Sequence, residues 1–477
     1  MTESRDVVLW IASNVPQDIL DTFAIAGSLE VRTEATINRE SLRSARLVIV
    51  PFASATTVGI NDLRAAIDAG CDLILLIRGD ASRADASRFG AQIATGVEVV
   101  DILDPLSARE ILRHALKIEP RLAENPSIEM PIELDAEAMV LLRRAFSDFK
   151  QVEILEEHGG FSGSRVLRIT ATNSDGKLAQ PFLVKCGDRK EIEDEVKNTR
   201  EFVLDYVPFP NRPPLVSIRC VAGSSKALIV SAFVERAVRL DLFLKTGLPE
   251  IVIAALFDGP LRNWRRQAER RRVHLSKYYQ EQGIVPTEPK VLERRFEKLK
   301  VGVPVGSLDP AALLDAFAAI EAVDTLICRS HGDLNVRNIF VKRTAVDVIL
   351  IDFEKTTEAH AARDAATLDV SLGFSFMETP IDEPVLDRLY APHVLQNKDY
   401  PRADERSEAS SRIEAIRQLR LQAASECLTR REYDLAIAVQ LVQAFWKWQE
   451  VGPERLVIAY RLASNLVQSL RDESKQT

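Results

Sequence analysis

The sequence has no long apolar run, few cysteines and no Cys-X-X-Cys motif. No apolar stretch approaches the roughly 20 residues that a membrane-spanning helix needs, so we expect no membrane insertion. The five cysteines are odd in number and far apart, which argues against a disulfide framework and against a zinc site. The N-terminus lacks the basic and apolar regions of a signal peptide. These absences predict a protein of the reducing cytoplasm.

The composition is that of an ordinary soluble globular protein. A chain of 477 residues corresponds to about two to four domains at roughly 100–200 residues each. The net charge is −8, and 28% of the residues are charged, which excludes disordered, fibrous and collagenous classes. The acidic balance also argues against a general nucleic-acid binder, although a local basic patch remains compatible with it.

Residues 1–118 alternate between short apolar runs and amphipathic segments. We expect strands over 7–12, 29–35, 46–52, 71–79 and 97–103, and helices over 16–27, 61–70 and 107–118. The apolar runs within 46–52 and 71–79 are typical of strands that are buried on both faces. This alternation predicts an α/β domain with a five-stranded parallel sheet. No Gly-X-Gly-X-X-Gly follows the first strand, which argues against a dinucleotide site.

The layout of residues 1–118 resembles a flavodoxin-like or receiver domain. Receivers carry carboxylates at the ends of the first and third strands, where this chain has IASN (11–14) and PFAS (51–54). Arg78 stands where a receiver has Lys. The resemblance therefore implies the fold without phosphorylation, and we expect this domain to dock a protein partner. The Pro-containing segment 119–131 and a helix over 134–149 predict a connecting region over 119–149.

The stretch RSHGDLNVRNIFV (329–341) gathers polar residues between apolar runs and is followed by the apolar strand VDVILIDFEK (346–355). Asp333 and Asn338 lie in the first stretch, and Asp352 ends the strand in the second. A carboxylate at the end of a buried strand is costly unless something pairs with it. Two carboxylates and an amide oxygen form a hard-oxygen site suited to Mg²⁺, which is what phosphoryl transfer requires.

HGDLNVRN followed by LIDFE resembles the aminoglycoside phosphotransferase and choline-kinase-like family, which has a protein-kinase-like fold. The resemblance implies that Asp333 is the catalytic base, that Asn338 is a metal ligand and that Asp352 is the main Mg²⁺ ligand. It also implies that His331 braces the loop and that a later aspartate, Asp364, steadies it.

One position in the motif departs from the family. Many members have His two residues after the catalytic Asp, where this chain has Asn335. The departure leaves the catalytic trio intact but leaves the subfamily open.

The resemblance implies further features upstream. A phosphate-covering loop between two strands would use Gly159, Gly160, Ser162, Gly163 and Ser164, because glycine allows close approach of backbone N–H groups to phosphate. Lys185 on the next apolar strand would bind phosphates. Its partner would be a glutamate of the helix over 190–203, Glu195 by the face of the helix, with Glu191 as the alternative. The strand and hinge over 227–236 would hold adenine by its backbone from Ser231 to 234, including Phe233.

The order of these features predicts a bilobal α+β kinase-like domain over 150–477. The N-lobe spans 150–235 and a mostly helical C-lobe spans 236–477, with helices over 405–475. The implied cofactors are ATP and Mg²⁺, and the implied partner is an acceptor of unknown identity that bears a hydroxyl group.

A basic insertion over 261–300 has twelve Lys or Arg against five Asp or Glu. We expect a helix over 261–280 whose arginines cover one surface: Arg262, Arg265, Arg266, Arg270 and Arg272. The plain interpretation is a solvated helix paired with acidic neighbours, and the functional one is a patch for an anionic ligand. Trp264, Tyr278 and Tyr279 are expected to be packing anchors.

Two other functions stay open. A nucleotide-binding pseudokinase or signalling scaffold is favoured by the fused N-terminal domain. It is also favoured by a resemblance to bacterial kinase-like modules associated with ternary complexes, which rests on the Gly-rich loop, HGDLNxRNI and WRRQ. Aminoglycoside phosphorylation would require an acidic substrate pocket, and the basic insertion argues against it.

Overall fold

A computed structural model describes residues 6–12, 15–26, 29–42, 45–69, 71–79, 83–94, 97–102, 111–112, 126–146, 148–156, 164–223, 225–245, 248–342, 347–375, 378–396 and 407–474. The chain divides into two compact units. The first comprises Met1–Val196 and Pro214–Phe233, and the second comprises Lys197–Pro213 and Val234–Thr477.

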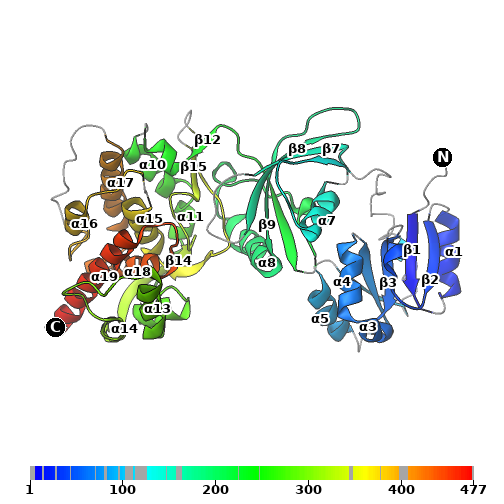
Figure 1. Ribbon diagram of the computed structural model, residues 1–477, viewed down its shortest axis with the longest axis horizontal. Coiled ribbons are helices and arrows are strands. Elements are labelled where there is room, and N and C mark those ends of the chain that lie inside the picture. Colours follow the sequence, from blue (N-terminus) through cyan, green and yellow to red (C-terminus); the bar gives the residue numbers. More distant parts are fainter. Residues whose placement is uncertain are drawn as a thin grey trace. The chain divides into compact units, whose positions relative to one another are not determined.

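The N-terminal part of the first unit contains a five-stranded sheet, as predicted (Figure 1). Its strands are β1 (Asp6–Ile11), β2 (Leu29–Glu34), β3 (Ala45–Pro51), β4 (Asp72–Ile77) and β5 (Glu98–Asp101). All neighbouring pairs are parallel, and the order is β2-β1-β3-β4-β5. The crossovers run through helices, as parallel pairing requires.

Helices cover both faces of this sheet. They are α1 (Gln17–Ala26), α2 (Arg39–Leu42), α3 (Phe52–Val58), α4 (Ile60–Asp68) and α5 (Arg83–Ile93). Val48 and Val50 of β3 pack in one cluster with side chains of α3, α4 and α5. Leu47 and Ile49 pack in another cluster with Ile19 of α1. Burial on both faces explains the uninterrupted apolar run of β3. The helix predicted over 107–118 lies outside the described residues except at 111–112.

The second sheet of the first unit has the order β10-β11-β9-β8-β7-β6. Its strands are β6 (Ser127–Glu129), β7 (Gln151–Glu156), β8 (Arg165–Thr172), β9 (Phe182–Asp188), β10 (Val221–Ala222) and β11 (Lys226–Ala232). Helix α7 (Ala136–Ala145) packs on one face through Leu141 and Leu142. Helix α8 (Arg189–Asn198) contributes Ile192 to a cluster with Ile229 of β11.

Strand β6 corrects the sequence analysis, which assigned 119–131 to a linker. Residues 127–129 pair in parallel with β7. Pro126 and Pro131 flank the strand without interrupting it, and β6 is an edge strand. Edge positions tolerate neighbouring prolines because one side of the strand makes no ladder hydrogen bonds.

The second unit is mostly helical, with two small sheets in the orders β12-β15-β16 and β13-β14-β17. The strands are β12 (Ala237–Arg239), β13 (Glu269–Val273), β14 (Val323–Ser330), β15 (Ile339–Lys342), β16 (Asp347–Leu350) and β17 (Thr357–His360). The helices are α9 (Leu240–Phe243), α10 (Pro249–Asp258), α11 (Arg262–Arg265), α12 (Leu275–Glu281), α13 (Pro289–Leu299), α14 (Pro310–Ala318), α15 (Arg363–Phe374), α16 (Glu383–Leu389), α17 (Glu408–Ala423), α18 (Arg430–Lys447) and α19 (Pro453–Ser474). The last three confirm the helices predicted over 405–475.

The core of the second unit is one large apolar cluster that includes Phe445 of α18 and Tyr460 of α19. Trp446 and Trp448 pack against it and are only half-buried. In the described part of the chain, no helix combines the length and the apolar character needed to cross a membrane.

The basic insertion is not the single helix that the sequence predicted. Helix α11 ends at Arg265, and residues 269–273 form β13, which pairs antiparallel with β14. Arg270 and Arg272 therefore lie on a strand rather than on the helix of Arg262. Helical spacing of the arginines could not reveal this, because the edge of β14 offers backbone hydrogen bonds that override local propensity.

Several insertion side chains have acidic or apolar neighbours. Arg265 forms a bidentate pair with Glu426, and Arg270 Nη2 lies 3.0 Å from Asp324 Oδ2. Arg271 Nη2 lies 2.7 Å from Glu269 Oε2. Trp264 is buried, and its indole N–H donates to the Phe202 carbonyl at 2.7 Å, as expected of a packing anchor. These ion pairs fit the plain interpretation of the basic segment.

Candidate active site

The loop between β14 and β15 is held by one buried carboxylate. Asp364, at the start of α15, accepts hydrogen bonds from Ser330 Oγ at 2.7 Å, from the backbone N–H of His331 at 2.9 Å and from that of Gly332 at 3.0 Å. It is almost fully buried. A carboxylate with three donors is well compensated for its burial, so the prediction that Asp364 steadies the loop is confirmed.

His331 and Gly332 fix the turn that precedes Asp333. His331 is fully buried, and its Nε2 lies 2.9 Å from the Ile351 carbonyl oxygen, so it braces the loop against the segment after β16. Gly332 has φ +83°, and a Cβ there would lie 2.1 Å from the carbonyl oxygen of Lys355. Only glycine fits such a position, because both the backbone angle and the space exclude a side chain.

Asp333 and Asn338 face each other across this loop. Asn338 Nδ2 donates to the Asp333 carbonyl oxygen at 2.9 Å and lies 3.4 Å from its Oδ2. The backbone N–H of Asn335 donates to the same carbonyl at 2.9 Å. These bonds orient the Asp333 side chain and direct the nitrogen of the Asn338 amide toward Asp333. The amide oxygen of Asn338 is then the atom that could reach a metal ion.

The carboxylates of Asp333 and Asp352 are close enough to influence each other. Burial raises the pKa of Asp333, and the negative charge of Asp352 raises it further; a hydrogen bond from Asn335 and the positive charge of Arg363 act in the opposite direction. Repulsion between two neighbouring carboxylates is the pattern expected where a cation belongs. The two aspartates that the sequence singled out therefore share one environment.

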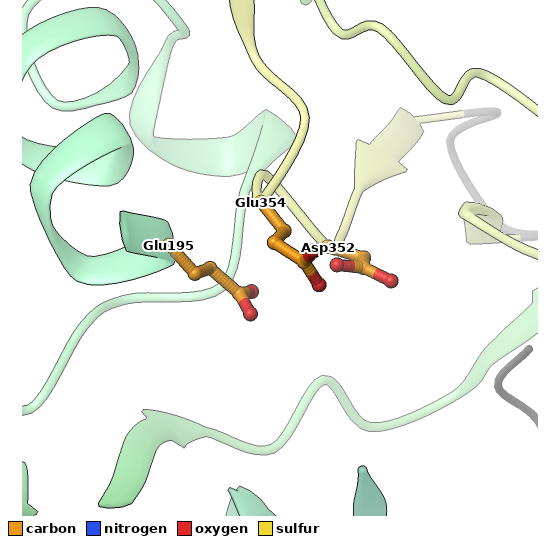
Figure 2. Close-up of side chains that lie close together, drawn as sticks. All are labelled: Glu195, Asp352 and Glu354. Atoms are coloured by element: carbon orange, nitrogen blue, oxygen red, sulfur yellow. The ribbon is translucent and has the colours of Figure 1, made fainter. Parts of the chain in front are cut away.

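Asp352 lies two residues after the apolar strand β16 and adopts a left-handed backbone, with φ +63°. This conformation, uncommon outside glycine, turns the chain so that a second carboxylate follows on the same loop. An oxygen of Glu354 lies within 4.8 Å of one of Asp352, and Figure 2 shows both side chains on this loop. Asn198 Nδ2 donates to the Glu354 carbonyl at 2.7 Å and so fixes the loop.

Glu354 is a residue that the sequence analysis missed. Its only signal was its place two positions after Asp352 in LIDFE. Asp333, Asp352 and Glu354 offer carboxylate oxygens and Asn338 offers an amide oxygen. These are the ligands that Mg²⁺ prefers, and the repulsion that raises the pKa of Asp333 is what a divalent cation would relieve. The residues present therefore fit Mg²⁺.

In the first unit, Lys185 of β9 pairs with Glu195 of α8. Lys185 Nζ lies 2.9 Å from Glu195 Oε2, and the two side chains are only 10% and 7% exposed. The alternative partner, Glu191, is exposed. Figure 2 also draws the Glu195 side chain at its place on α8. Removing either partner of such a pair would leave an uncompensated buried charge.

Most of the predicted phosphate loop, Gly159, Gly160, Ser162 and Gly163, lies outside the described residues. Ser164, which precedes β8, is buried, and its hydroxyl has no hydrogen-bond partner within the described ranges. A Cβ on Gly187 would come within 2.0 Å of that hydroxyl oxygen, so glycine at 187 makes room for Ser164.

The predicted adenine-binding backbone needs a correction at Phe233. Ser231 lies in β11 opposite Leu183, and the N–H of Phe233 donates to the Pro181 carbonyl at 2.9 Å. The N–H of Ala232 is likewise taken by the Pro214 carbonyl at 2.8 Å. The two backbone donors at 232 and 233 are therefore already used, which the sequence could not reveal because loop contacts decide it.

A model of the lipopolysaccharide kinase (Kdo/WaaP) family matches residues 314–392. This segment contains Asp333, Asn338, Asp352 and Asp364. The predicted relationship to kinases is confirmed for this part of the chain, which is homologous to phosphotransferases. A comparison with curated proteins gave no match.

Several solved structures of kinases are similar to the chain. An aminoglycoside phosphotransferase from Streptomyces rimosus is 17% identical, with 60% of this chain and 99% of that chain covered and a TM-score of 0.32. An ethanolamine kinase from Plasmodium vivax is 13% identical, with 77% and 98% covered and a TM-score of 0.35. A macrolide 2'-phosphotransferase type I is 15% identical, with 64% and 89% covered and a TM-score of 0.30. Similarities at this level support no conclusion about substrate.

Proposed function

We propose that the chain is an ATP- and Mg²⁺-dependent phosphotransferase that transfers the γ-phosphoryl group to a hydroxyl group. The observation that supports this best is the loop on which Asn338 orients Asp333, with the charge of Asp352 close enough to raise the pKa of Asp333. The family match over the same residues agrees with it.

In the proposed reaction, Asp333 accepts the proton of the acceptor hydroxyl while that oxygen attacks the γ-phosphorus. A bond forms between the acceptor oxygen and phosphorus, the bond between phosphorus and the bridging oxygen breaks, and ADP leaves with the electron pair. Asn338 and Asp352 would hold Mg²⁺, which when bound neutralises charge on the phosphates.

The first unit would bind the rest of the nucleotide. Lys185, oriented by Glu195, would bind the α- and β-phosphates. Gly159, Gly160, Ser162, Gly163 and Ser164 would cover the phosphates. Adenine would contact the backbone near Ser231 through groups other than the N–H of Phe233.

The fold of each part of the chain and the cellular location of the protein belong to the same proposal. We assign residues 150–477 to a bilobal kinase-like fold in the cytoplasm, where ATP is available. The strand order of the N-terminal sheet is the one that flavodoxin-like domains use, and we assign it that fold. Its role would be to dock a protein partner, because the segments 11–14 and 51–54 supply no phosphoacceptor carboxylate.

Two substitutions test the proposed chemistry. Asp333→Ala should lower ADP formation with Mg²⁺ and ATP by on the order of 10² or more while ATP still binds. Asp352→Ala should weaken the binding of Mg²⁺ and ATP, measured by isothermal titration calorimetry. Asp347→Ala, at the opposite end of β16, is the matched control and should change neither quantity.

Near-normal turnover by Asp333→Ala would refute the assignment of the base. An unchanged affinity for Mg²⁺ and ATP in Asp352→Ala would refute the metal site. Nucleotide binding without ADP formation, across a broad panel of acceptors, would instead support the pseudokinase or scaffold alternative.

A further inference from the structure

A buried arginine beside the catalytic loop has only neutral partners. Arg363, the first residue of α15, is 5% exposed. Its Nη2 donates to the Gly332 carbonyl at 2.8 Å, directly before Asp333, and its Nη1 donates to Gln282 Oε1 at 2.7 Å. Its Nε has no hydrogen-bond partner, and no carboxylate forms an ion pair with it among the described residues. A buried guanidinium with no carboxylate in direct hydrogen-bond contact is costly.

A lysine from a distant helix bonds to the same turn as Arg363. Lys447 ends α18, and its Nζ donates to the Gly283 carbonyl at 2.7 Å. The neighbouring Trp446 donates its indole N–H to the Ile284 carbonyl at 3.0 Å. These two bonds anchor the turn 282–284 on α18, and Gln282 of that turn holds Arg363. Within the described ranges Lys447 also has no carboxylate partner.

The charges of Arg363 and Lys447 both interact with that of Asp333, and Arg363 bonds to the Gly332 carbonyl directly before Asp333. The side chain of Lys447 is exposed as a whole, but the shielding of its ammonium group lowers its pKa, the charges of Lys355 and Arg363 lower it further, and the charge of Asp333 raises it. Lys355 contacts the Glu354 carboxylate, so of these three cations only Arg363 and Lys447 have neutral hydrogen-bond partners among the described residues. Like charges attached to one turn repel each other, and the repulsion falls when an anion binds to both.

We propose that Arg363 and Lys447 bind an anionic group, a phosphate or a carboxylate, on the acceptor whose hydroxyl group faces Asp333. This inference rests on the proposed function and names its substrate class. Guanidinium and ammonium groups are suited to binding phosphate and carboxylate through charge-assisted hydrogen bonds. The same two charges repel an acceptor that carries several amino groups. The transfer itself is unchanged: the acceptor hydroxyl loses its proton to Asp333 and gains the phosphoryl group.

Matched acceptors test the proposal. ADP formation by the full chain is measured with glycerol, glycerol 3-phosphate, glycerate and choline, and the readout is the ratio of kcat/KM for each anionic acceptor to that for glycerol. We expect anionic acceptors to be preferred and choline to be the poorest. Lys447→Met should lower the ratio by roughly fivefold, and Lys447→Arg should restore most of it. Lys298→Met, on the exposed surface of α13, is the matched control.

Direct binding decides the proposal if none of these acceptors is turned over. Inorganic phosphate is titrated by calorimetry into the chain loaded with Mg²⁺ and the non-hydrolysable analogue AMP-PNP, so that the γ-phosphate position is filled. We expect phosphate to bind to the wild type and Lys298→Met, and roughly fivefold more weakly to Lys447→Met.

Equal phosphate affinity in Lys447→Met, absence of phosphate binding, or a preference for choline would overturn the acceptor assignment. Failure of AMP-PNP to bind would overturn the proposed function instead. In that case the phosphate titration of the nucleotide-free chain still decides whether Lys447 contributes to an anion site.

Discussion

The pair between Lys185 and Glu195 provides the sharpest test of the first unit. Glu195→Gln keeps the size of the side chain and an oxygen that can accept from Lys185 Nζ, but it removes the negative charge. Because both side chains are about nine-tenths buried and their charged atoms lie 2.9 Å apart, Lys185 would keep its charge with no anion in the pair. We therefore expect a loss of stability and of nucleotide affinity.

The magnitude follows from the burial of the pair. Removing one partner of a buried ion pair costs about 3–5 kcal/mol. The neutral hydrogen bond that glutamine can still accept is worth about 1 kcal/mol. The free energy of unfolding should therefore fall by roughly 2–4 kcal/mol. Glu191→Gln on the same helix is the control, because Glu191 is exposed, and it should change stability by less than about 0.5 kcal/mol.

Urea-induced unfolding, followed by far-UV circular dichroism, measures this difference. A double-mutant cycle with Lys185→Met isolates the interaction, because the double variant removes both charges and should recover part of the loss. ATP affinity is measured on the same proteins. If Glu195→Gln and Glu191→Gln lose the same stability, or if the cycle gives no coupling, the assignment of Glu195 as the partner is wrong.

Two further predictions concern the second unit. Gly332→Ala should lower the free energy of unfolding by more than about 3 kcal/mol and abolish activity, because its Cβ would lie 2.1 Å from a backbone oxygen. Gly306→Ala is the control: Gly306 has φ +82° but open space around it, so the loss should be only about 1 kcal/mol. Equal shifts of the melting temperature in the two variants would refute the clash. Burial raises the pKa of Asp434 from 3.8 to about 6, so the folded state holds this proton to higher pH than the unfolded state does. The protonated Asp434 contributes its full stabilisation below pH 3.8, and this stabilisation is lost as pH rises through about 6, a fall of roughly 3 kcal/mol in the free energy of unfolding. Asp434→Asn should flatten this part of the plot of unfolding free energy against pH. An unchanged slope would contradict the shift.

The sequence predicted that Asp333, Asn338 and Asp352 come together, and the structure joins Asp333 to Asn338 and brings the charge of Asp352 near Asp333, because the three lie in one short segment. Asp333 and Asn338 share one loop, and Asp352 lies two residues after β16, the second strand of the hairpin that β15 and β16 form, so local chain geometry brings them together. The family resemblance named Asp364 as the support of the loop, and its hydrogen bonds agree. The strand pattern of residues 1–102 was readable for a related reason, because strands buried on both faces are continuously apolar.

Where partners came from distant segments, the sequence was less informative. Strand β13 exists because the edge of β14 pairs with it, and arginine spacing carried no sign of that pairing. The N–H of Phe233 is taken by a carbonyl from another segment, which no local pattern could indicate.

By itself, the sequence indicated which residues are candidates for catalysis and in what order they occur, because their motif resembles that of a phosphotransferase family, in which phosphoryl transfer requires particular side chains at short spacing. Only the tertiary structure decided which charges surround them. Arg363 and Lys447 lie 84 positions apart in the sequence, and their common attachment to the turn 282–284 follows from helix packing. Electrostatic energy depends on distance in space and on burial, and neither can be read from separation along the chain.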